Sequence, residues 1–180
     1  MVEQASPRLT IRDASEADAA ACAAIYRPFV LDTAVSFEIT PPTEAEMAAR
    51  IGEAAGTHAW LVAELGGEVA GYAYARPFAA REAYRWSTET SIYLSPLHRG
   101  SGVGRSLYEA LLARLIERGF RVVVAKMTLP NPASEGLHAA LGFRPVGVHR
   151  RIGFKNGFWY DVAIAQRELA PAIDHPTEPC

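Results

Sequence analysis

The sequence has little cysteine, no long apolar run and no excess of basic residues, and each shortage excludes a class of protein. Its 180 residues include two cysteines, Cys22 and Cys180, which are too few for a disulfide framework or a paired metal site. No apolar stretch approaches the length that spans a bilayer, and the N-terminal stretch lacks a basic start followed by an apolar segment. We therefore expect a cytoplasmic protein with no metal site and no membrane association.

The charge balance argues against nucleic acid as a partner. The formal net charge is −2 at pH 7 and no block of lysine or arginine occurs, whereas nucleic-acid binding depends on a basic surface. The length and the 49% hydrophobic content indicate one domain with one sizeable core. We expect this domain to cover residues 8–169, with flexible termini at 1–7 and 170–180.

Hydrophobic periodicity and turn residues predict alternating strands and helices. Strands are predicted at 9–13, 59–65, 68–77, 87–95 and 121–127, and a final hairpin at 144–154 and 157–169 around Asn156-Gly157. Helices are predicted at 15–27, ending before Pro28, at 43–55 behind a Thr43/Glu46 capping box, at 103–118, and at 133–141 before Gly142. This order predicts a single α/β domain, with a mixed sheet of about seven strands flanked by about four helices.

The stretch RGSGVG at 99–104 places three glycines between a predicted strand and a predicted helix. Unpaired backbone N–H groups and the helix dipole make such a turn an anion site. A nucleoside-triphosphate loop would need Gly-Lys-Ser/Thr, but Arg105 and Ser106 follow Gly104. A dinucleotide loop would need G-x-G-x-x-G and an acidic residue after the next strand, which instead ends at 125–127 in AKM. A turn that is glycine-rich without binding a ligand remains an alternative.

A third kind of anion loop fits better. Arg99-x-x-Gly102-x-Gly104 resembles the [RQ]-x-x-G-x-[GA] pyrophosphate loop of the GCN5-related N-acetyltransferases (GNAT), and the flanking elements, LPNPAS and LHAALGF resemble that superfamily's core. The runs YRPFV, TAVSFE, ARPFAAREAY, TETSIYL and GFKNGFWYDV resemble the subgroup that acetylates phosphinothricin, methionine sulfoximine or methionine sulfone. The resemblance implies a GNAT fold, acetyl-CoA as co-substrate, and direct acetyl transfer to the α-amine of a small amino-acid analogue. It also implies a homodimer.

Two residues are candidates for proton transfer, which an amine acceptor requires because it is mostly protonated near neutral pH. Glu89 occupies the position of the general base that the resemblance implies, and the alternative is an ordinary strand-surface carboxylate. His138 stands where many members have a tyrosine that acts as the acid, and in the resembled subgroup a histidine is usual. Its role as acid, orienting group or pocket lining stays open.

The cofactor site implied by the resemblance has three parts. The loop would bind the diphosphate through Arg99, Gly100, Ser101, Gly102, Val103 and Gly104. The main chain of Ile92, Tyr93 and Leu94 would pair with the pantetheine amides at a splay between neighbouring strands. Asn131 and Ser134 would complete the site, although Asn131 between two prolines is also a typical turn residue.

The substrate candidates follow from the anionic groups of an amino-acid acceptor, which bidentate arginines read well. They are Arg76, Arg81, Tyr84, Phe29 and Phe37, and the resemblance implies that the segment with Arg81 and Tyr84 comes from the neighbouring subunit. Packing alone also explains both phenylalanines, and Arg85 is expected to be solvated. Ala79 stands where phosphinothricin-resistance enzymes commonly have lysine, which favours methionine sulfone, methionine sulfoximine or another analogue over phosphinothricin itself.

Two alternatives share the glycine loop. One is a non-catalytic acyl-CoA-binding sensor, which would need the loop but not Glu89, His138 and the arginine-aromatic segment. The other is a GNAT enzyme for a protein N-terminus, a polyamine or an aminoglycoside, acceptors that favour an acidic groove, whereas this segment is rich in arginine. No cysteine lies near the motifs to carry an acyl group, so we expect direct transfer in a ternary complex.

Overall fold

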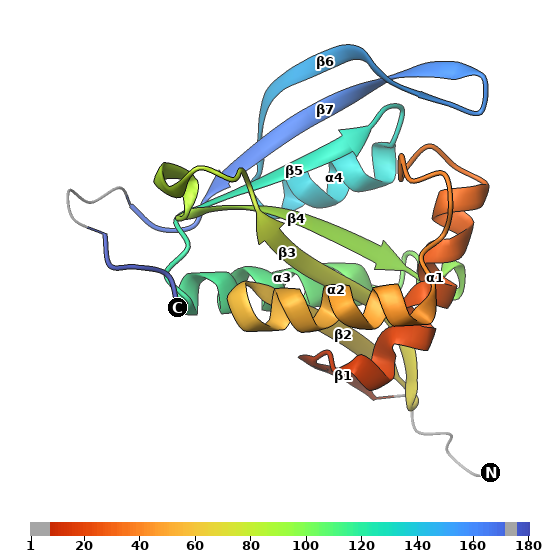
Figure 1. Ribbon diagram of the computed structural model, residues 1–180, viewed down its shortest axis with the longest axis horizontal. Helices are drawn as coiled ribbons and strands as arrows, with labels where there is room; N and C mark the ends of the chain where they lie inside the picture. The colour runs from red at the N-terminus through yellow and green to blue at the C-terminus, as the bar shows by residue number, and fades with distance from the viewer. Residues whose placement is uncertain (1–7, 172–175) are drawn as a thin grey trace.

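Seven strands form one mixed sheet in the computed structural model, which describes residues 8–171 and 176–180 (Figure 1). The strands are β1 (Leu9–Asp13), β2 (Ala59–Leu65), β3 (Glu68–Pro77), β4 (Ser87–Leu94), β5 (Val122–Thr128), β6 (Arg144–Lys155) and β7 (Phe158–Glu168). Their order is β1-β2-β3-β4-β5-β7-β6, and among these strands β4 and β5 are the one parallel pair. The predicted α/β class and strand number are confirmed.

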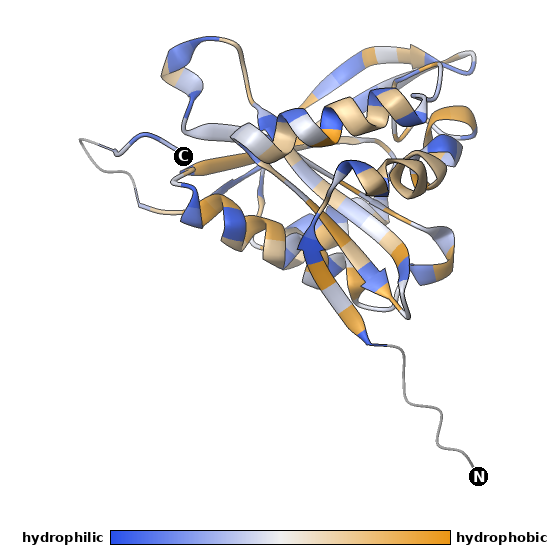
Figure 2. Cartoon of the chain, turned by 60° about the horizontal axis from the view of Figure 1, so that its bottom comes forward, coloured by the Kyte–Doolittle hydropathy of each residue, from blue (hydrophilic) through white to orange (hydrophobic). Residues whose placement is uncertain are grey.

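Helices cover both faces of the sheet. They are α1 (Ala19–Leu31), α2 (Glu44–Thr57), α3 (Val103–Glu117) and α4 (Pro132–Ala140). Trp60 and Val62 of β2 share a core with α1 and α2, whereas Leu61 and Ala63 pack with α3 on the other face, as the two-residue period of a strand requires. Apolar and polar residues accordingly intermingle along the helices (Figure 2). Within the described ranges, no helix is long and apolar enough to cross a membrane.

The predicted turns and the predicted capping box are confirmed. Asn156 and Gly157 have φ of 51° and 83°, the left-handed conformation that a tight hairpin turn needs, and they join β6 to β7. Thr43 and Glu46 cap α2 reciprocally, with the Thr43 amide donating to Glu46 Oε2 at 2.7 Å. Both features are therefore found where the local sequence predicts them.

The predicted end of the first helix is wrong, because α1 continues through Pro28 to Leu31. Pro28 lacks an N–H and removes one helical hydrogen bond, but Tyr26 and Val30 are buried on either side of it and keep the helix against the sheet. The Val30 carbonyl, in the last turn, accepts a 2.7 Å hydrogen bond from Lys155 Nζ of β6. Contacts distant in sequence thus override the local signal of proline.

The predicted flexible termini are described only in part. Residues 1–7 and 172–175 lie outside the described residues. Residues 176–180 contact the domain: Trp86 Nε1 donates to the Thr177 carbonyl at 2.8 Å, and the Cys180 amide donates to the Arg118 carbonyl at 3.0 Å. This last part of the chain is held against the loop before β4 and the end of α3.

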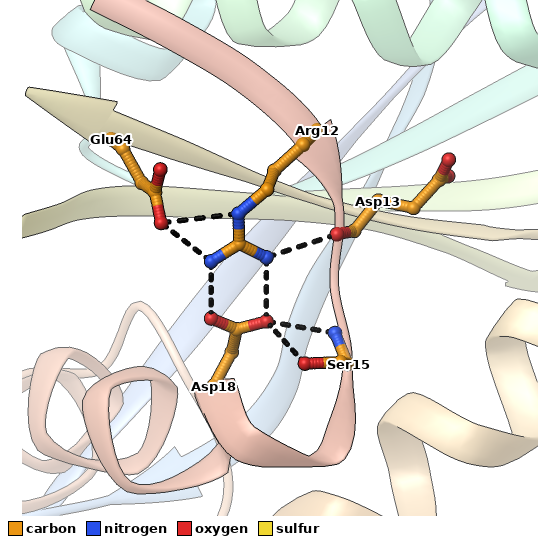
Figure 3. A network of polar contacts seen from close by, with 5 residues as sticks. All are labelled: Arg12, Asp13, Ser15, Asp18 and Glu64. Atoms are coloured by element: carbon orange, nitrogen blue, oxygen red, sulfur yellow. Dashed lines mark hydrogen bonds and ion pairs between the residues drawn. The ribbon is translucent and has the colours of Figure 1, made fainter. Parts of the chain in front are cut away.

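Arg12 ties β1 to its neighbours through a network of charges (Figure 3). Its guanidinium donates to both carboxylate oxygens of Asp18 at 2.7 and 2.8 Å, and its Nε donates to Glu64 at 3.1 Å. The Ser15 amide also donates to Asp18, at 2.7 Å. The hydrogen bonds from Arg12 lower the pKa of Asp18 to about 2, despite the opposing effect of burial. The network therefore stabilises an ionised, nearly buried carboxylate where the chain turns into α1.

Replacing Arg12 with methionine should lower the free energy of unfolding by about 2 kcal/mol at pH 7, because Asp18 loses its cation. The pKa of Asp18 is lower in the folded chain than in the unfolded chain, so this stabilisation is present above the ordinary carboxyl pKa. It is lost as the pH falls toward about 2. Urea unfolding of the wild type and the variant at several pH values between 7 and 2 measures the difference, which should shrink steadily on acidification.

Arg105→Met is the matched control, because Arg105 makes an exposed pair with Glu109 at 2.9 Å on α3. Such a pair contributes less than about 0.5 kcal/mol. Equal losses in the two variants, or a loss for Arg12→Met that does not change with pH, would contradict the role assigned to the network.

Candidate active site

The strands β4 and β5 separate partway along their length. Residues 87–90 of β4 pair in parallel with residues 122–125 of β5, whereas β4 remains paired with β3 as far as Leu94. Among the described strands, none pairs with residues 91–94 on the β5 side. A narrow cavity opens in this splay, lined by Val35, Thr90, Ser91, Ile92, Tyr93, Lys126, Met127, Thr128, Asn131, Ser134 and His138. The predicted splay is therefore present, and Ile92 and Tyr93 line it.

The glycine loop leads from the end of β4 into α3. Gly100 and Gly102 have φ of 74° and 84°, and Gly102 is the N-cap of α3, with no side chain hydrogen-bonded as a cap. The first amides of the helix have no acceptor within it, so they are free to bind an anion. Gly104 allows the helix to approach β4, since a Cβ there would lie 2.7 Å from Leu94 Cδ1. The Arg99 guanidinium lies 5.4 Å from the centre of the Phe29 ring, beside this loop.

Glu89 lies on β4 between two cations and is 5% exposed. Its Oε1 accepts a hydrogen bond from Arg76 Nη2 of β3, and its Oε2 pairs with Lys126 Nζ of β5 at 2.7 Å. Burial alone would raise the pKa of Glu89, but the hydrogen bonds from Lys126 and Arg76 outweigh burial and hold that pKa below its ordinary value. Glu89 is therefore a carboxylate at neutral pH, with each oxygen engaged by one cation.

A second, larger cavity of about 600 Å³ opens on the same side of the sheet as α1. It is lined by Tyr26, Val35, Ser36, Phe37, Glu38, Tyr74, Arg76, Glu89, Ser91, Tyr93, Lys126, Thr128, His149, Ile152 and Val162. Ser91, Tyr93 and Lys126 also line the splay, so the two cavities adjoin. We name this larger space the acceptor cavity, because it presents the ionised Glu89 next to the splay.

The segment 35–38 forms one wall of the acceptor cavity, and Lys155 holds it in place. Lys155 is 3% exposed and its Nζ donates to the Ser36 carbonyl at 2.6 Å, in addition to the Val30 carbonyl at the end of α1. The ring of Phe37 packs against Gly153, where any Cβ would collide with it. The position of the Phe37 side chain therefore depends on β6, far away in the sequence.

His138 lies at the far end of the splay and is 4% exposed. Its Nδ1 lies 2.7 Å from the Ser134 carbonyl, which can only accept, so the proton resides on Nδ1 and Nε2 accepts a 3.0 Å bond from the Tyr108 hydroxyl. Tyr108 Oη lies 2.6 Å from Thr90 Oγ1. Burial lowers the pKa of His138. The histidine is thus neutral and fixed in one tautomer, and it links α4 to β4 through a tyrosine.

The sequence allows two roles for Asn131, a turn residue or part of the cofactor site, and its place in the structure is compatible with both. It is the N-cap of α4, where its Oδ1 accepts a 3.2 Å bond from the Ser134 amide, and it also lines the splay. Ser134 lines the same cavity, and its Oγ lies 3.3 Å from His138 Nδ1. Capping uses the Asn131 oxygen and not its side-chain N–H groups.

Three predicted substrate residues are not in the acceptor cavity of this chain. Arg81 and Tyr84 line a separate cavity with residues 178–180. Phe29 packs edge-on against Tyr93, at 5.2 Å between ring centres, and is not part of the acceptor-cavity wall. Arg76 and Phe37 do line the acceptor cavity, beside Glu89. The structure therefore brings together the base candidate and two of the five substrate candidates.

Sequence reasoning missed Lys126, Tyr108 and Glu38. Lys126 interrupts the apolar run VVVAKM of β5, and a lysine within such a run is the one signal that singles it out. Tyr108 and Glu38 carry no local signal, because each becomes part of the site only through contacts across the sheet. Among the described residues, no three histidine, cysteine, aspartate or glutamate side chains cluster as a metal site would require.

Comparison with known proteins shows the family to which the chain belongs. Residues 23–143 match the acetyltransferase (GNAT) family, and the chain belongs to that family. It is an acetyl-CoA-dependent N-acetyltransferase with the GNAT fold.

Its relatives include enzymes for amino-acid analogues. The chain is 41% identical over 170 residues to a phosphinothricin N-acetyltransferase of Streptomyces viridochromogenes, covering 94% of this chain and 93% of the relative. It is 35% identical over 169 residues to an L-methionine sulfoximine/L-methionine sulfone acetyltransferase of Pseudomonas aeruginosa, covering 93% and 98%. A crystal structure of a GNAT superfamily phosphinothricin acetyltransferase from Sinorhizobium meliloti in complex with acetyl-CoA has a TM-score of 0.90 and 44% identity, covering 94% of each chain.

Proposed function

We propose that this enzyme transfers the acetyl group of acetyl-CoA to the α-amine of a small amino-acid analogue of the methionine sulfone, methionine sulfoximine or phosphinothricin type. The observation that carries the proposal is the acceptor cavity, which holds an ionised Glu89 together with Arg76, beside the splay. A base and a reader of anions in one small cavity suit a zwitterionic acceptor. The relatives that act on such analogues support the same substrate class.

In this mechanism, Glu89 takes the proton of the α-ammonium group, directly or through a water molecule. The freed amine attacks the thioester carbonyl carbon and the new C–N bond forms. The C–S bond then breaks with its electron pair on sulfur, and the proton that the nitrogen loses balances the one that the departing coenzyme A thiolate takes up. Among the described residues that line the two cavities there is no cysteine to carry an acyl group, which supports direct transfer. We assign His138 as an orienting group, because its Nδ1 proton is engaged by Ser134 and its Nε2 receives the hydroxyl of Tyr108.

Acetyl-CoA supplies the activated acetyl group, and three parts of the chain would hold it. The amides of residues 99–104 and the start of α3 would bind the diphosphate. The main chain of Ile92, Tyr93 and Leu94 would bond the pantetheine amides across the splay. Asn131 would donate through its side-chain nitrogen, since its oxygen caps α4.

We further propose a cytoplasmic homodimer. The β6–β7 hairpin exposes large apolar side chains that a partner surface could cover: Val146, Val148, Ile152, Phe154, Phe158 and Trp159. Arg81 and Tyr84 lie outside the acceptor cavity of their own chain, which suits a role in the cavity of a partner. Sedimentation equilibrium of the purified protein at micromolar concentration should give the mass of two chains, and a single-chain mass would remove the proposal.

The test of the proposed function is release of free thiol from acetyl-CoA with a panel of acceptors. The panel contains methionine sulfone, methionine sulfoximine, phosphinothricin, common amino acids, spermidine and an aminoglycoside. We expect saturable turnover confined to the first three compounds. Turnover with only the cationic amines would show that the proposed substrate class is wrong. Tight binding of acetyl-CoA with no turnover would identify a sensor instead.

A further inference from the structure

Arg76 is the more exposed of the two cations that pair with Glu89. The side chain of Arg76 is 57% exposed, against 42% for Lys126 and 6% for Glu89. Arg76 also lines a neighbouring cavity of about 370 Å³, together with Tyr74 and Glu38, which line both spaces. A ligand can therefore reach the Arg76 guanidinium, and the guanidinium has open space into which it can move away from Glu89.

The other titratable groups that line the acceptor cavity do not compete with Glu89 for Arg76 and Lys126. Glu38, from the segment before α2, is already bound by Arg50 at 2.8 and 3.0 Å and by the Tyr26 hydroxyl at 3.0 Å. Tyr74 of β3, Tyr93 of β4 and His149 of β6 complete the titratable lining. Among the residues that the structure describes, Arg76 and Lys126 are the two lysine or arginine side chains that line the acceptor cavity. Both pair with Glu89.

This arrangement penalises an acceptor that is only a cation. An α-ammonium group that approaches Glu89 meets two cations already in place, and its own charge adds to them. A zwitterionic acceptor can instead exchange partners, since its carboxylate offers Arg76 a new anion while its ammonium group replaces Arg76 at Glu89. The number of ion pairs rises by one, and no buried charge is left unpaired.

We propose that Arg76 is a gate on Glu89: the free α-carboxylate of the acceptor draws the Arg76 guanidinium away, and only then does Glu89 receive the ammonium proton. This inference rests on the proposed function and deepens it, because it limits the acceptors to amines that carry an adjacent anion. In the proton step, one N–H bond of the α-ammonium group breaks and an O–H bond forms at Glu89 Oε1. Lys126 stays on Oε2 and holds the carboxylate in place.

The experiment compares methionine sulfone with its α-carboxamide, which keeps the amine and removes the anion. For the wild type we expect kcat/KM to favour the acid by about 100-fold. In Arg76→Met we expect kcat/KM for the acid to fall by about 100-fold, whereas kcat/KM for the amide rises severalfold, because Glu89 is no longer occupied by the guanidinium. Arg76→Lys keeps a cation and should restore most of the preference for the acid.

The opposite signs for acid and amide distinguish a gate from a merely structural residue. A parallel fall of both acceptors in Arg76→Met, or an unchanged rate with the acid, would overturn the gate. Arg27→Met is the matched control, because Arg27 is exposed on α1 outside both cavities, and it should leave both acceptors unchanged. If the wild type acetylates neither these two compounds nor methionine sulfoximine nor phosphinothricin, the proposed function itself fails, an outcome separate from failure of the gate.

Discussion

The Glu89→Gln enzyme should transfer acetyl about 1,000-fold more slowly than the wild type at neutral pH, with unchanged affinity for acetyl-CoA. Glutamine keeps the shape of the side chain but cannot accept the ammonium proton. Glu89 lies in the wall of the acceptor cavity and not in the 99–104 loop, so cofactor binding should be spared. Thiol release measures kcat, and calorimetric titration with acetyl-CoA measures the affinity.

The pH dependence of this variant gives the sharper test. Above the pKa of the acceptor amine most of the substrate is already neutral, so the deficit of Glu89→Gln should shrink as the pH rises. Glu117→Gln, an exposed carboxylate at the end of α3 with a 3.6 Å contact to Arg114, is the control and should behave as the wild type. Equal turnover by Glu89→Gln and the wild type across the pH range would remove Glu89 as the base.

The second large effect is expected at Gly102. Valine there should weaken acetyl-CoA binding about 100-fold, because the backbone at this N-cap has φ of 84°, a conformation that costs a side-chain-bearing residue about 1–2 kcal/mol. The side chain would also stand beside the free amides of α3. A Cβ at Gly102 meets no atom within 4 Å, so the strain should be relieved by movement of the loop and not by displacement of packed side chains. Titration with acetyl-CoA measures the loss.

Gly56→Ala serves as its control. Gly56 lies in α2, has no positive φ, and a Cβ there also meets nothing within 4 Å. Alanine should therefore stabilise the helix by about 0.4–1 kcal/mol and leave acetyl-CoA binding unchanged. If Gly102→Val bound acetyl-CoA as tightly as Gly56→Ala, the loop would not be the diphosphate site.

Several features of this fold can be predicted from short stretches of sequence. The Asn156-Gly157 turn, the Thr43/Glu46 capping box and the glycine-to-helix junction at 102–104 each depend on residues a few positions apart, and each is found where local chemistry predicts it. The end of α1 is not predictable in this way, since Lys155 holds that end from a strand more than a hundred residues away.

The residues of the candidate site likewise include some that the sequence predicts and some that it does not. Glu89 and the loop carry sequence patterns, but the partners of Glu89 depend on strand register. Arg76 lies directly opposite Glu89 between β3 and β4, and Lys126 reaches it from β5 two residues beyond the cross-strand partner Val124. A single sequence does not fix which residues of three strands stand side by side, so the gate could be inferred only from the sheet.

The splay also bears on how the domain holds together. Among the strands that the structure describes, the two halves of the sheet, β1–β4 and β5–β7, are joined where residues 87–90 pair with residues 122–125, and beyond that point they diverge. A bound thioester whose amides bond to residues 92–94 would act there as a substitute strand. The proposed site thus lies at the junction between the two halves of the sheet, so binding of acetyl-CoA there should raise the free energy of unfolding.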